Sequence, residues 1–466
     1  MIVNQVLKDY FDTRRRMHLF LFKLCNIAII ENIQRRCKVS KFLFVSLDGL
    51  ISDTAWQVVK EGHEVKYFIK TAADKDIADG FVPKTENWEQ EVDWADIVVF
   101  DDVLGQGKIA QRLRQKGKRV IGGTEYTDRL EDDRAFGQEE LKRMGVNIIP
   151  YSYYSSFDEA IEYVRANPNR YVIKPSGEAQ NLKRMLFVGE EEDGKDVIQV
   201  LEAYKNILKR KTIDFQLQKR ISGVEVAVGA FFNGSQFVYP ININFEHKKL
   251  FPGNIGPSTG EMGTSMYWSG SNKIFNATLQ KLEAKLREEG YVGYIDINCI
   301  VNYNGIYPLE FTARFGYPTI CIQQEGILMP MGEFLLKLAE GQMTEFKAKK
   351  GFQVGVRIVV SPYPFNDKET FEGYSKNTAI LFKKIDLNGI HIEDTKIVDG
   401  QWLIAGTSGV VLVVVGTGQT MRQAQAQVYT RIKNIMIPNM YFRTDIGDRW
   451  FEDCDKLHTW GYLRET

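Results

Sequence analysis

From residue 41 onwards, short apolar runs alternate with segments whose apolar positions recur every three to four residues. The apolar runs predict β-strands, and the second pattern predicts amphipathic helices. The predicted strands cover residues 41–46, 64–70, 96–100 and 119–122, and the predicted helices cover 52–62 and 107–117. This alternation is typical of a doubly wound α/β domain. The loop after the first strand has one glycine, Gly49, where a dinucleotide-binding loop has three, so a nicotinamide site is excluded.

A second group of elements begins near Asp132. Residues 132–145 have a helical pattern, and Ser156 followed by Glu159 forms a capping box that predicts another helix through Arg165. Strands are predicted at 171–174 and 183–188, on either side of a small-residue loop. Towards the C-terminus, apolar runs at 351–361, 400–407 and 409–418 predict strands, and 419–435 predicts one closing helix. These last segments indicate a β-rich domain.

Composition narrows the function classes. The 466 residues include 60 Lys+Arg and 60 Asp+Glu, so the chain has no formal net charge. We therefore expect no nucleic acid and no membrane as partner. The five cysteines (Cys25, Cys37, Cys299, Cys321, Cys454) have no zinc-site spacing, which indicates free thiols in a reducing, cytoplasmic compartment.

Residues 1–40 differ from the rest of the chain because basic residues dominate them. Their apolar run, residues 18–30, is interrupted by Lys23 and is shorter than the roughly 20 residues that span a bilayer. It lacks a signal-peptide cleavage site. We interpret 1–40 as a basic N-terminal extension, with Met17 as an alternative start.

Four features carry candidate chemistry. Lys174 ends a predicted strand before the loop 175–181, an arrangement that suits a phosphate clamp, although a solvated lysine before a turn has the same pattern. A cationic stretch, 246–249, leads into the glycine-rich segment 256–263, which would let the backbone approach a ligand closely, although an irregular surface loop with spaced glycines has the same composition. Asp296 and Glu310 lie on adjacent predicted strands, as carboxylates for Mg²⁺ do, although each alone could be an ordinary strand acid. Arg314 offers a fork of donors to phosphate or carboxylate.

Three segments resemble the phosphoribosylamine-glycine ligase (glycinamide ribonucleotide synthetase) family of the ATP-grasp superfamily. They are HKKLFPGNIGPSTGEMGT, YPLEFTARFGYP and NMYFRTDIGDRW. The resemblance runs from about residue 42 to about 450. It implies a multidomain protein of α/β and α+β class, with a pre-ATP-grasp doubly wound domain, central ATP-grasp lobes and a C-terminal β-rich domain. We place these at 41–123, 124–345 (small lid lobe about 150–220) and 350–450, followed by a tail at 451–466.

The resemblance also implies roles for individual residues. The nucleotide would be held by Lys174, the Gly177 loop, Lys183, Gln218, Lys219, Ile221 and Glu225. Mg²⁺ (or Mn²⁺) would be held by Glu310, with Asp296, Thr312 and Asn298 as further candidates. The carboxylate substrate would lie against Gly256, Pro257, Ser258, Thr259, Gly260 and Arg314. Lys248 and Arg314 would neutralise charge during the reaction, and His247 is the one histidine placed within reach of a substrate. His63, His391 and His458 are interpreted as surface or packing residues.

The sequence also departs from the family pattern. The acid pair at the adenine hinge is replaced by Gln218 and Lys219, and the second lid cation has to come from Lys183 or Arg184. Thr312 stands where the family has a metal-binding asparagine. The segment that helps to hold the amine substrate in the family is 48–53 here and has two acids, so a substrate phosphate would have to be bound elsewhere, at Lys108 or the glycines of 104–107.

Three interpretations of function follow. The first is phosphoribosylamine-glycine ligase, which uses ATP, glycine and phosphoribosylamine through an acyl phosphate in purine biosynthesis. The second is an ATP-grasp ligase for another carboxylate and amine, favoured by the altered segment 48–53 and by Glu261. The third is a non-catalytic nucleotide-binding regulator, suggested by Thr312 and the altered hinge. In each case we expect small-molecule ligands and a monomer or small homo-oligomer.

Overall fold

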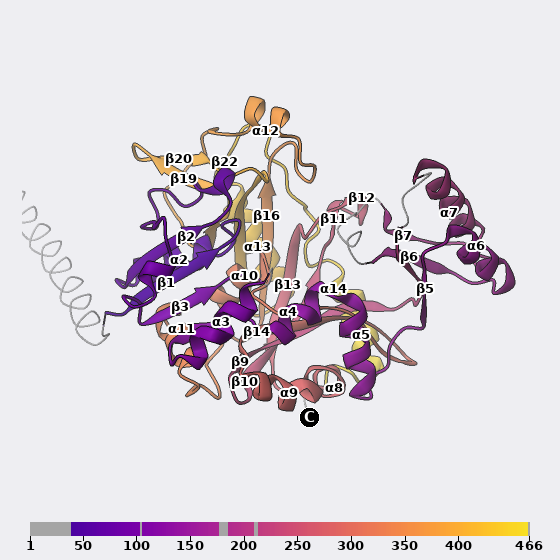
Figure 1. Ribbon diagram of the computed structural model, residues 1–466. Coiled ribbons are helices and arrows are strands. Elements are labelled where there is room, and N and C mark those ends of the chain that lie inside the picture. Colours follow the sequence, from indigo (N-terminus) through magenta and orange to yellow (C-terminus); the bar gives the residue numbers. More distant parts are fainter. Residues whose placement is uncertain (1–38, 103–104, 177–184, 209–212, 465–466) are drawn as a thin grey trace, which may run out of the picture.

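A four-stranded parallel sheet forms the first domain. The structure, a computed structural model, describes residues 39–102, 105–176, 185–208 and 213–464 (Figure 1). The strands are β1 (Lys41–Ser46), β2 (Glu64–Ile69), β3 (Ile97–Phe100) and β4 (Arg119–Ile121), in the order β2-β1-β3-β4. Helices α2 (Ser52–Lys60) and α3 (Gln106–Gln115) connect them. The chain adds β2 on one side of β1 and then β3 and β4 on the other side, so the order of strands reverses between β1 and β3. In doubly wound folds, the carboxyl ends of the two strands at such a reversal border a ligand-binding crevice.

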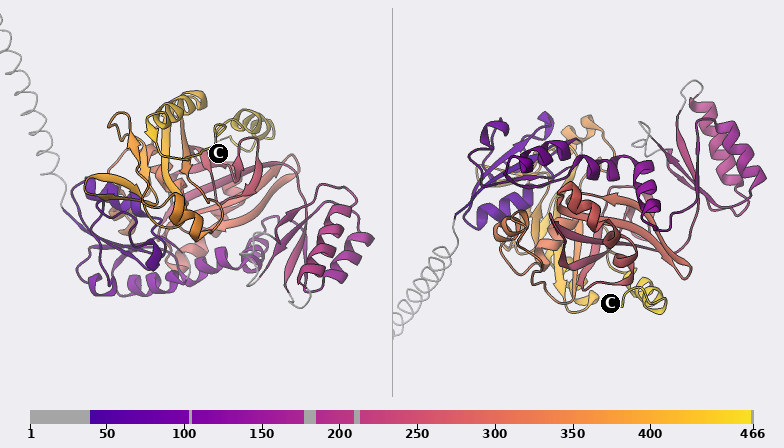
Figure 2. Two further views of the ribbon diagram at one scale, coloured as in Figure 1. Left: turned by 90° about the horizontal axis from the view of Figure 1, so that it is seen from above. Right: turned by 60° about the horizontal axis from the view of Figure 1, so that its bottom comes forward.

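A small lobe stands out from the rest of the molecule (Figures 1 and 2). Its sheet has the order β5-β8-β6-β7, with β5 (Tyr151–Tyr154), β6 (Tyr171–Pro175), β7 (Phe187–Val188) and β8 (Phe215–Lys219). Helices α6 (Phe157–Ala166) and α7 (Lys195–Leu208) pack on one face through Val164, Ile173, Leu201 and Leu217. Because side chains alternate along a strand, Lys174 and Gln216 lie on the other face.

The largest sheet has eight antiparallel strands in the order β15-β14-β9-β10-β13-β16-β21-β18. Their bounds are β9 (Val224–Asn233), β10 (Phe237–Glu246), β13 (Gly263–Ser269), β14 (Val292–Asn302), β15 (Gly305–Thr312), β16 (Phe352–Val359), β18 (Ile390–Ile392) and β21 (Val410–Gly418). Strands β16, β21 and β18 belong to the predicted C-terminal β-rich region, yet they continue the sheet through the pairing of β13 with β16. The central and C-terminal regions therefore share one sheet.

Helices and short strands complete the fold around this sheet. The helices are α4 (Glu125–Asp132), α5 (Arg134–Arg143), α8 (Lys273–Ala277), α9 (Glu283–Glu289), α10 (Thr319–Gly326), α11 (Met331–Ala339), α12 (Lys368–Tyr374), α13 (Met421–Ile432) and α14 (Trp450–Thr459). The 3₁₀ turns are η1 (Ala72–Asp74), η2 (Glu89–Glu91) and η5 (Leu279–Leu282). The strand pairs are β11 (Lys249–Phe251) with β12 (Ile255–Ser258), β17 (Leu381–Phe382) with β22 (Ile435–Met436), and β19 (Thr395–Val398) with β20 (Gln401–Ile404).

The predicted fold class, mixed α/β and α+β with several domains, is confirmed. Of the predicted strand 183–188, residues 187–188 form β7, and 183–184 lie outside the described residues. No helix in the described part of the chain is long and apolar enough to cross a membrane. The apolar run 18–30 lies outside that part, as do Cys25 and Cys37; the described cysteines Cys299, Cys321 and Cys454 are free thiols.

Candidate active site

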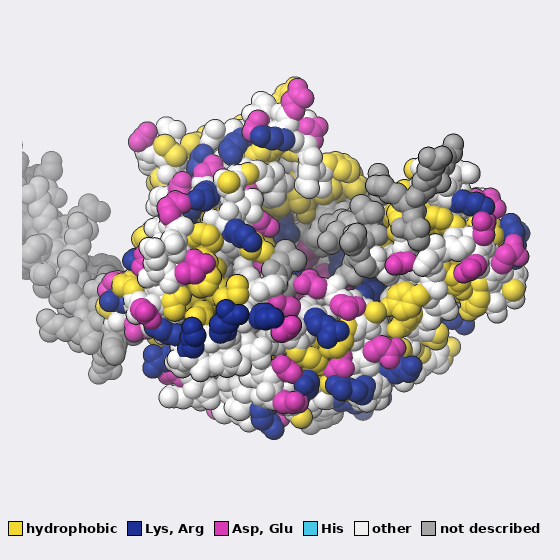
Figure 3. Space-filling model, viewed as in Figure 1, with side chains coloured by type: hydrophobic (Ala, Val, Ile, Leu, Met, Phe, Trp, Pro, Cys, Tyr) yellow, Lys and Arg dark blue, Asp and Glu magenta, His cyan; other side chains and the backbone are white. Residues whose placement is uncertain are grey.

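A hollow between the small lobe and the main body contains charged side chains of both signs (Figure 3). On the lobe side, Lys174 of β6 stands opposite Gln216 of β8. Burial lowers the pKa of Lys174 to about 8, and the positive charge of Arg134 acts in the same direction. Arg134 also donates to the carbonyl oxygen of Pro175 at 3.0 Å and borders a pocket of about 410 Å³. Two cations close together in a hollow form a suitable site for a polyphosphate.

On the body side, Lys248 joins carboxylates from three strands of the large sheet. Its ammonium lies 3.2 Å from Glu225 of β9, 3.3 Å from Glu246 of β10 and 3.2 Å from Glu310 of β15. Lys248 lowers the pKa of Glu310 to about 2, outweighing the opposing effect of burial. Burial disfavours the charge of Lys248 itself, but the three carboxylates raise its pKa well above the ordinary value.

Three carboxylates around one ammonium leave an excess of two negative charges. Mg²⁺ prefers such oxygen donors and uses one or two carboxylates together with substrate phosphates. The donor set of this cluster, called the Lys248 cluster from here on, therefore fits a magnesium ion that accompanies a nucleotide.

The four candidate metal ligands share one face of β14 and β15. In the ladder Asn298 stands opposite Glu310, and Asp296 stands opposite Thr312. Asn298 donates to Glu246 at 3.1 Å, which connects it to the Lys248 cluster. Asp296 is 2% exposed, and burial followed by the charge of Glu246 raises its pKa, which favours the neutral carboxyl. The geometry therefore favours Glu310 with Asn298 over Asp296 for a metal.

The glycine-rich segment is tied directly to Lys248. Gly256 has φ of 85°, and a Cβ at this position would lie 2.6 Å from the ring of Phe251, so the β11–β12 turn needs a glycine here. The backbone N–H and the hydroxyl of Thr259 both donate to the carbonyl oxygen of Lys248 at 2.8 Å. Pro257, Ser258 and Gly260 flank these bonded residues. The loop and the cationic group thus have a fixed relative position.

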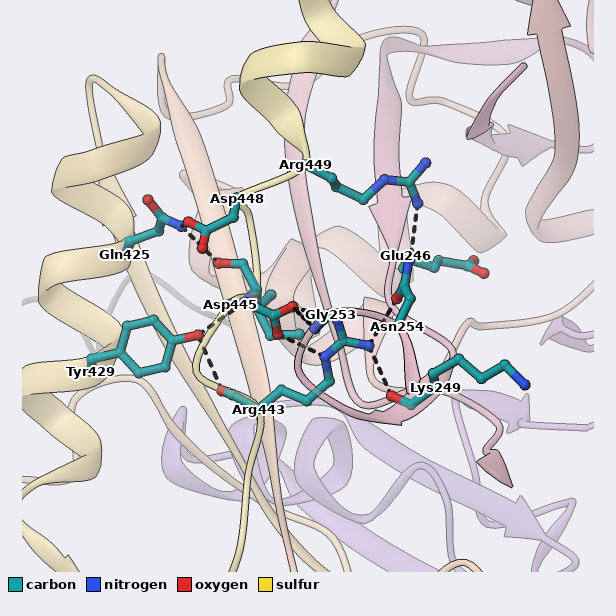
Figure 4. A network of polar contacts seen from close by, with 11 residues as sticks. Glu246, Lys249, Gly253, Asn254, Gln425, Tyr429, Arg443, Asp445, Asp448 and Arg449 are labelled. Carbon is teal, nitrogen blue, oxygen red and sulfur yellow. Dashed lines mark hydrogen bonds and ion pairs between the residues drawn. The ribbon is translucent and has the colours of Figure 1, made fainter. Parts of the chain in front are cut away.

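A buried arginine from the C-terminal segment holds the β11–β12 hairpin (Figure 4). Arg443 is 1% exposed and makes a bidentate ion pair with Asp445 at 2.8 and 2.6 Å. It also donates to the carbonyl oxygen of Lys249 at 2.9 Å and to the Asn254 side chain at 3.0 Å. Asp445 in turn accepts from the N–H of Gly253 at 2.9 Å. The segment that resembles the family near the C-terminus thus supports the proposed substrate loop.

His247 and Glu261 lie beneath this loop. His247 is 3% exposed, and burial together with the positive charge of Arg449 lowers its pKa to about 3. Its burial and its lowered pKa favour a neutral imidazole, and contact of His247 with a substrate stays a prediction. Glu261 is also buried and accepts a hydrogen bond from Thr264. Arg357 donates to the carbonyl oxygen of Glu261 at 3.1 Å.

Arg314 is paired within the protein. Its guanidinium lies 3.1 Å from Glu131 and donates to the carbonyl oxygen of Phe315 at 2.8 Å. Glu131 also accepts from the N–H of Ala313 at 2.7 Å, so it fixes the backbone before the arginine. A substrate anion at Arg314 would share this guanidinium with Glu131.

The predicted adenine hinge lies at the end of β8. Gln218 is buried and stands opposite Tyr151, whereas Lys219 is exposed and stands opposite Tyr171. Lys219 borders a pocket of about 360 Å³ on the helix side of the lobe. Ile221 follows two residues later. Gly177 and Lys183 lie outside the described residues.

Two carboxyl groups lie at the carboxyl ends of β1 and β3. Ser46 donates to Asp101, a fully buried carboxyl whose pKa is raised to about 8, mainly by burial. Asp48 accepts from Thr71 at 2.6 Å. The N–H of Gly107, one of the groups suggested for a substrate phosphate, already donates to Asp128 at 2.9 Å. Lys108 lies 3.7 Å from Glu125 instead.

The expectation that His391 is only a surface or packing residue is wrong, because His391 lies in a cluster of ionisable groups. Its Nδ1 is 2.7 Å from Asp53, and its Nε2 is 3.5 Å from Glu325. His63, by contrast, accepts from the N–H of Ser40 and contacts the ring of Phe42, as expected of a packing residue. His458 is exposed.

Three functional candidates were missed from the sequence: Glu246, Arg134 and Glu131. Glu246 is the first residue of the cationic stretch 246–249, but polar residues at 242, 244 and 246 in an otherwise apolar run indicate one polar face of a strand. Arg134 and Glu131 belong to helices α5 and α4, and only the packing of these helices against β15 and β6 brings them to the site. Their local sequence carries no comparable signal.

Comparisons with known proteins agree with this geometry. Residues 132–320 match the family described as "Phosphoribosylglycinamide synthetase, ATP-grasp (A) domain", and residues 353–449 match its C domain. These two regions cover more than half of the chain. A phosphoribosylamine-glycine ligase of Streptococcus pneumoniae is 26% identical over 364 residues, which are 75% of this chain and 82% of that protein. The corresponding protein of Halalkalibacterium halodurans is 25% identical over 359 residues, 73% of this chain and 79% of that protein.

Solved structures show the same fold. The phosphoribosylamine-glycine ligase of Thermotoga maritima superposes with a TM-score of 0.64 at 21% identity, covering 87% of this chain and all (100%) of that one. A biotin carboxylase of Campylobacter jejuni superposes with a TM-score of 0.59 at 15% identity, covering 91% and 98%. The resemblance inferred from the three sequence segments is confirmed. The chain belongs to the phosphoribosylglycinamide synthetase family of the ATP-grasp superfamily.

Proposed function

We propose that the protein is an ATP-dependent ligase that joins glycine to 5-phosphoribosylamine, giving glycinamide ribonucleotide for purine biosynthesis. The observation that carries the proposal is the Lys248 cluster on the large sheet, because the charges of Lys248, Glu225 and Glu310 also act on Lys174 of the small lobe. A nucleotide between two sheets, with cations and carboxylates at its phosphates, is what this arrangement can hold. The free thiols of the described residues fit a reducing cytoplasm.

The reaction needs no nucleophile from the enzyme. A carboxylate oxygen of glycine attacks the γ-phosphorus of ATP, the bond to ADP breaks, and an acyl phosphate forms. The amine nitrogen then attacks the acyl carbon, phosphate leaves with the electron pair of the broken C–O bond, and the nitrogen loses a proton to give the amide. The protein accelerates these steps by holding the reactants in position and neutralising charge.

Each charged group has a distinct task in this scheme. Lys174, with Arg134 beside it, pairs with phosphate oxygens of ATP. Glu310 and Asn298 would hold Mg²⁺, which would neutralise charge on the phosphates when bound, and Lys248 would balance the carboxylates that remain. Arg314 contacts the reacting carboxylate, while Glu131 keeps its guanidinium in place. The segment 256–260 encloses the glycine.

One observation favours a second candidate, an ATP-grasp ligase for another amine. Asp48 lies after β1, Asp101 after β3 is fully buried with a raised pKa, and the N–H of Gly107 is already paired, so none of these three groups suits the phosphate of phosphoribosylamine. An amine that lacks a phosphate would fit the crevice at these strand ends better.

The test is release of phosphate from ATP with glycine and phosphoribosylamine, formed in the assay, and with a panel of other carboxylates and amines. We expect turnover that requires both substrates and is lost in Arg314→Ala. Arg287→Ala is the matched control, because that arginine pairs with Glu283 on the surface. Turnover with another pair alone would support the second candidate, and no amine-dependent ADP release with any pair would contradict a ligase.

A further inference from the structure

His391, Asp53 and Glu325 form a buried cluster that connects three distant parts of the chain. Asp53 lies in the first turn of α2, His391 in the middle of β18 at the edge of the large sheet, and Glu325 near the end of α10. His391 and Asp53 are 2% and 1% exposed. We refer to these three residues as the His391 bridge.

Both carboxylate oxygens of Asp53 have hydrogen-bond partners on other elements. One oxygen is 2.7 Å from Nδ1 of His391 and also accepts from Gln324 at 3.1 Å. The other accepts from the N–H of Ile392 at 3.0 Å. A side chain of the first domain is thus bonded to both α10 and β18.

The imidazole is charged at neutral pH. Burial alone disfavours the charge, but Asp53 and then Glu325 outweigh it and raise the pKa of His391 to about 9. Lys60 of α2 also acts on Asp53, and Lys349 acts on Glu325. A buried ion pair contributes little net stability compared with apolar side chains of similar size, whereas its geometry is strict. The bridge is therefore better suited to fixing a position than to stabilising the fold.

The position that it fixes is the start of α2 and the loop before it. Residues 47–51 connect β1 to α2 at the crevice between β1 and β3. Within this turn the N–H of Gly49 donates to Ser46 at 2.7 Å, and Ser52 donates to the carbonyl oxygen of Gly49 at 2.6 Å. The turn is rigid within itself, so its place relative to the large sheet depends on how α2 is attached.

We propose that His391 is a positioning residue, which through Asp53 and Glu325 holds the 47–51 loop in register with the large sheet so that the amine substrate meets the acyl phosphate. This rests on the proposed function, because it requires an amine at the carboxyl ends of β1 and β3. ATP binds at the other end of the large sheet, at β9, β10 and β15. The bridge therefore acts on the amine and leaves the nucleotide site unchanged.

The test compares His391→Gln with the wild-type protein, using His458→Gln as a matched control on an exposed histidine. Because a displaced 47–51 loop would hold the amine less tightly, we expect the KM for the amine to rise about 10-fold or more. The KM for ATP should change less than about twofold. Glu325→Gln should shift the same constant in the same direction. Equal increases in the KM for ATP and the KM for the amine, or an unchanged KM for the amine, would overturn the proposal.

A second measurement does not depend on the substrate. Hydrogen exchange followed by mass spectrometry should show faster exchange in peptides covering 46–60 of His391→Gln, with β9 and β10 unchanged. If the wild-type protein shows no turnover with glycine and phosphoribosylamine, the proposed function fails while this measurement still decides on the bridge. Unchanged exchange at 46–60 would overturn the inference. So would a stoichiometric metal lost in His391→Gln, because Asp53, Cys321 and His391 would then be its ligands.

Discussion

Replacing Arg443 by methionine should loosen the β11–β12 hairpin while leaving the fold intact. The change keeps an apolar stem of similar length but removes four donated hydrogen bonds, two to Asp445 and one each to Lys249 and Asn254. Removing one partner of a buried ion pair costs about 3–5 kcal/mol. The Asp445 side chain is 22% exposed and keeps its bond from Gly253, so water relieves part of the penalty and the expected loss is about 3 kcal/mol.

Hydrogen exchange measures this loss locally, which suits a protein of several domains better than a single unfolding midpoint. About 3 kcal/mol corresponds to roughly 150-fold faster exchange of the protected amides in residues 249–259. Arg422→Met, on the exposed side of α13, is the matched control and should change nothing in this segment. Arg443→Met combined with Asp445→Leu should recover part of the protection, because no carboxylate is left without its partner.

The reasoning would be refuted by two results. Exchange in 249–259 that stays within about twofold of the wild-type protein would show that Arg443 does not hold the hairpin. A double variant that is less protected than Arg443→Met would show that the carboxylate of Asp445 is not the source of the penalty.

Three further predictions concern the nucleotide site and the N-terminus. Lys174→Ala and Glu310→Ala should each lower ATP turnover about 10²-fold or more with unchanged circular dichroism, and wild-type turnover in both would contradict their roles. The ammonium of Lys174 is charged at pH values below a pKa of about 8 and neutral above it, so kcat/KM for ATP should fall as the pH rises through about 8. This decrease should be absent in Lys174→Arg, and a decrease that persists in that variant would belong to another group. Deleting residues 1–38 should leave a soluble ligase of unchanged activity, and an insoluble or inactive protein would show that this segment packs on the rest.

Local patterns were sufficient to predict those helices and strands whose structure depends mainly on residues close by in the sequence. β1 has the predicted bounds, and α2 begins at the predicted residue and ends two residues before the predicted end, because an apolar run and an amphipathic period are local properties of the sequence. Lys174 is predicted for the same reason, since the pattern places it near the end of a strand before a small-residue loop, and its role stays a prediction. The family segments then indicated the place of Glu310 and Arg314 in the site.

Groups that meet through long-range pairing could not be found in this way. Glu225, Glu246 and Glu310 surround Lys248 only because β10 and β14 pair on either side of β9 and β15 pairs with β14. The same limit applies to His391. Its partner Asp53 is 338 residues away in the sequence, and its other partner, Glu325, lies on helix α10. The electrostatic surroundings of His247 also depend on packing, because Arg443, Asp445 and Arg449, which act on it, come from the C-terminal segment.

The pairing of β13 with β16 has a consequence for any attempt to divide this chain. Five residue pairs, from Gly263 with Val356 to Tyr267 with Phe352, join the part that matches the ATP-grasp domain to the part that matches the C domain. A protein cut between residues 345 and 350 would therefore present two newly opened strand edges rich in apolar side chains. Unpaired strand edges of this kind can pair with other chains, so each fragment made alone should aggregate. Fragments produced together in one cell can instead reassemble through the pairing of β13 with β16.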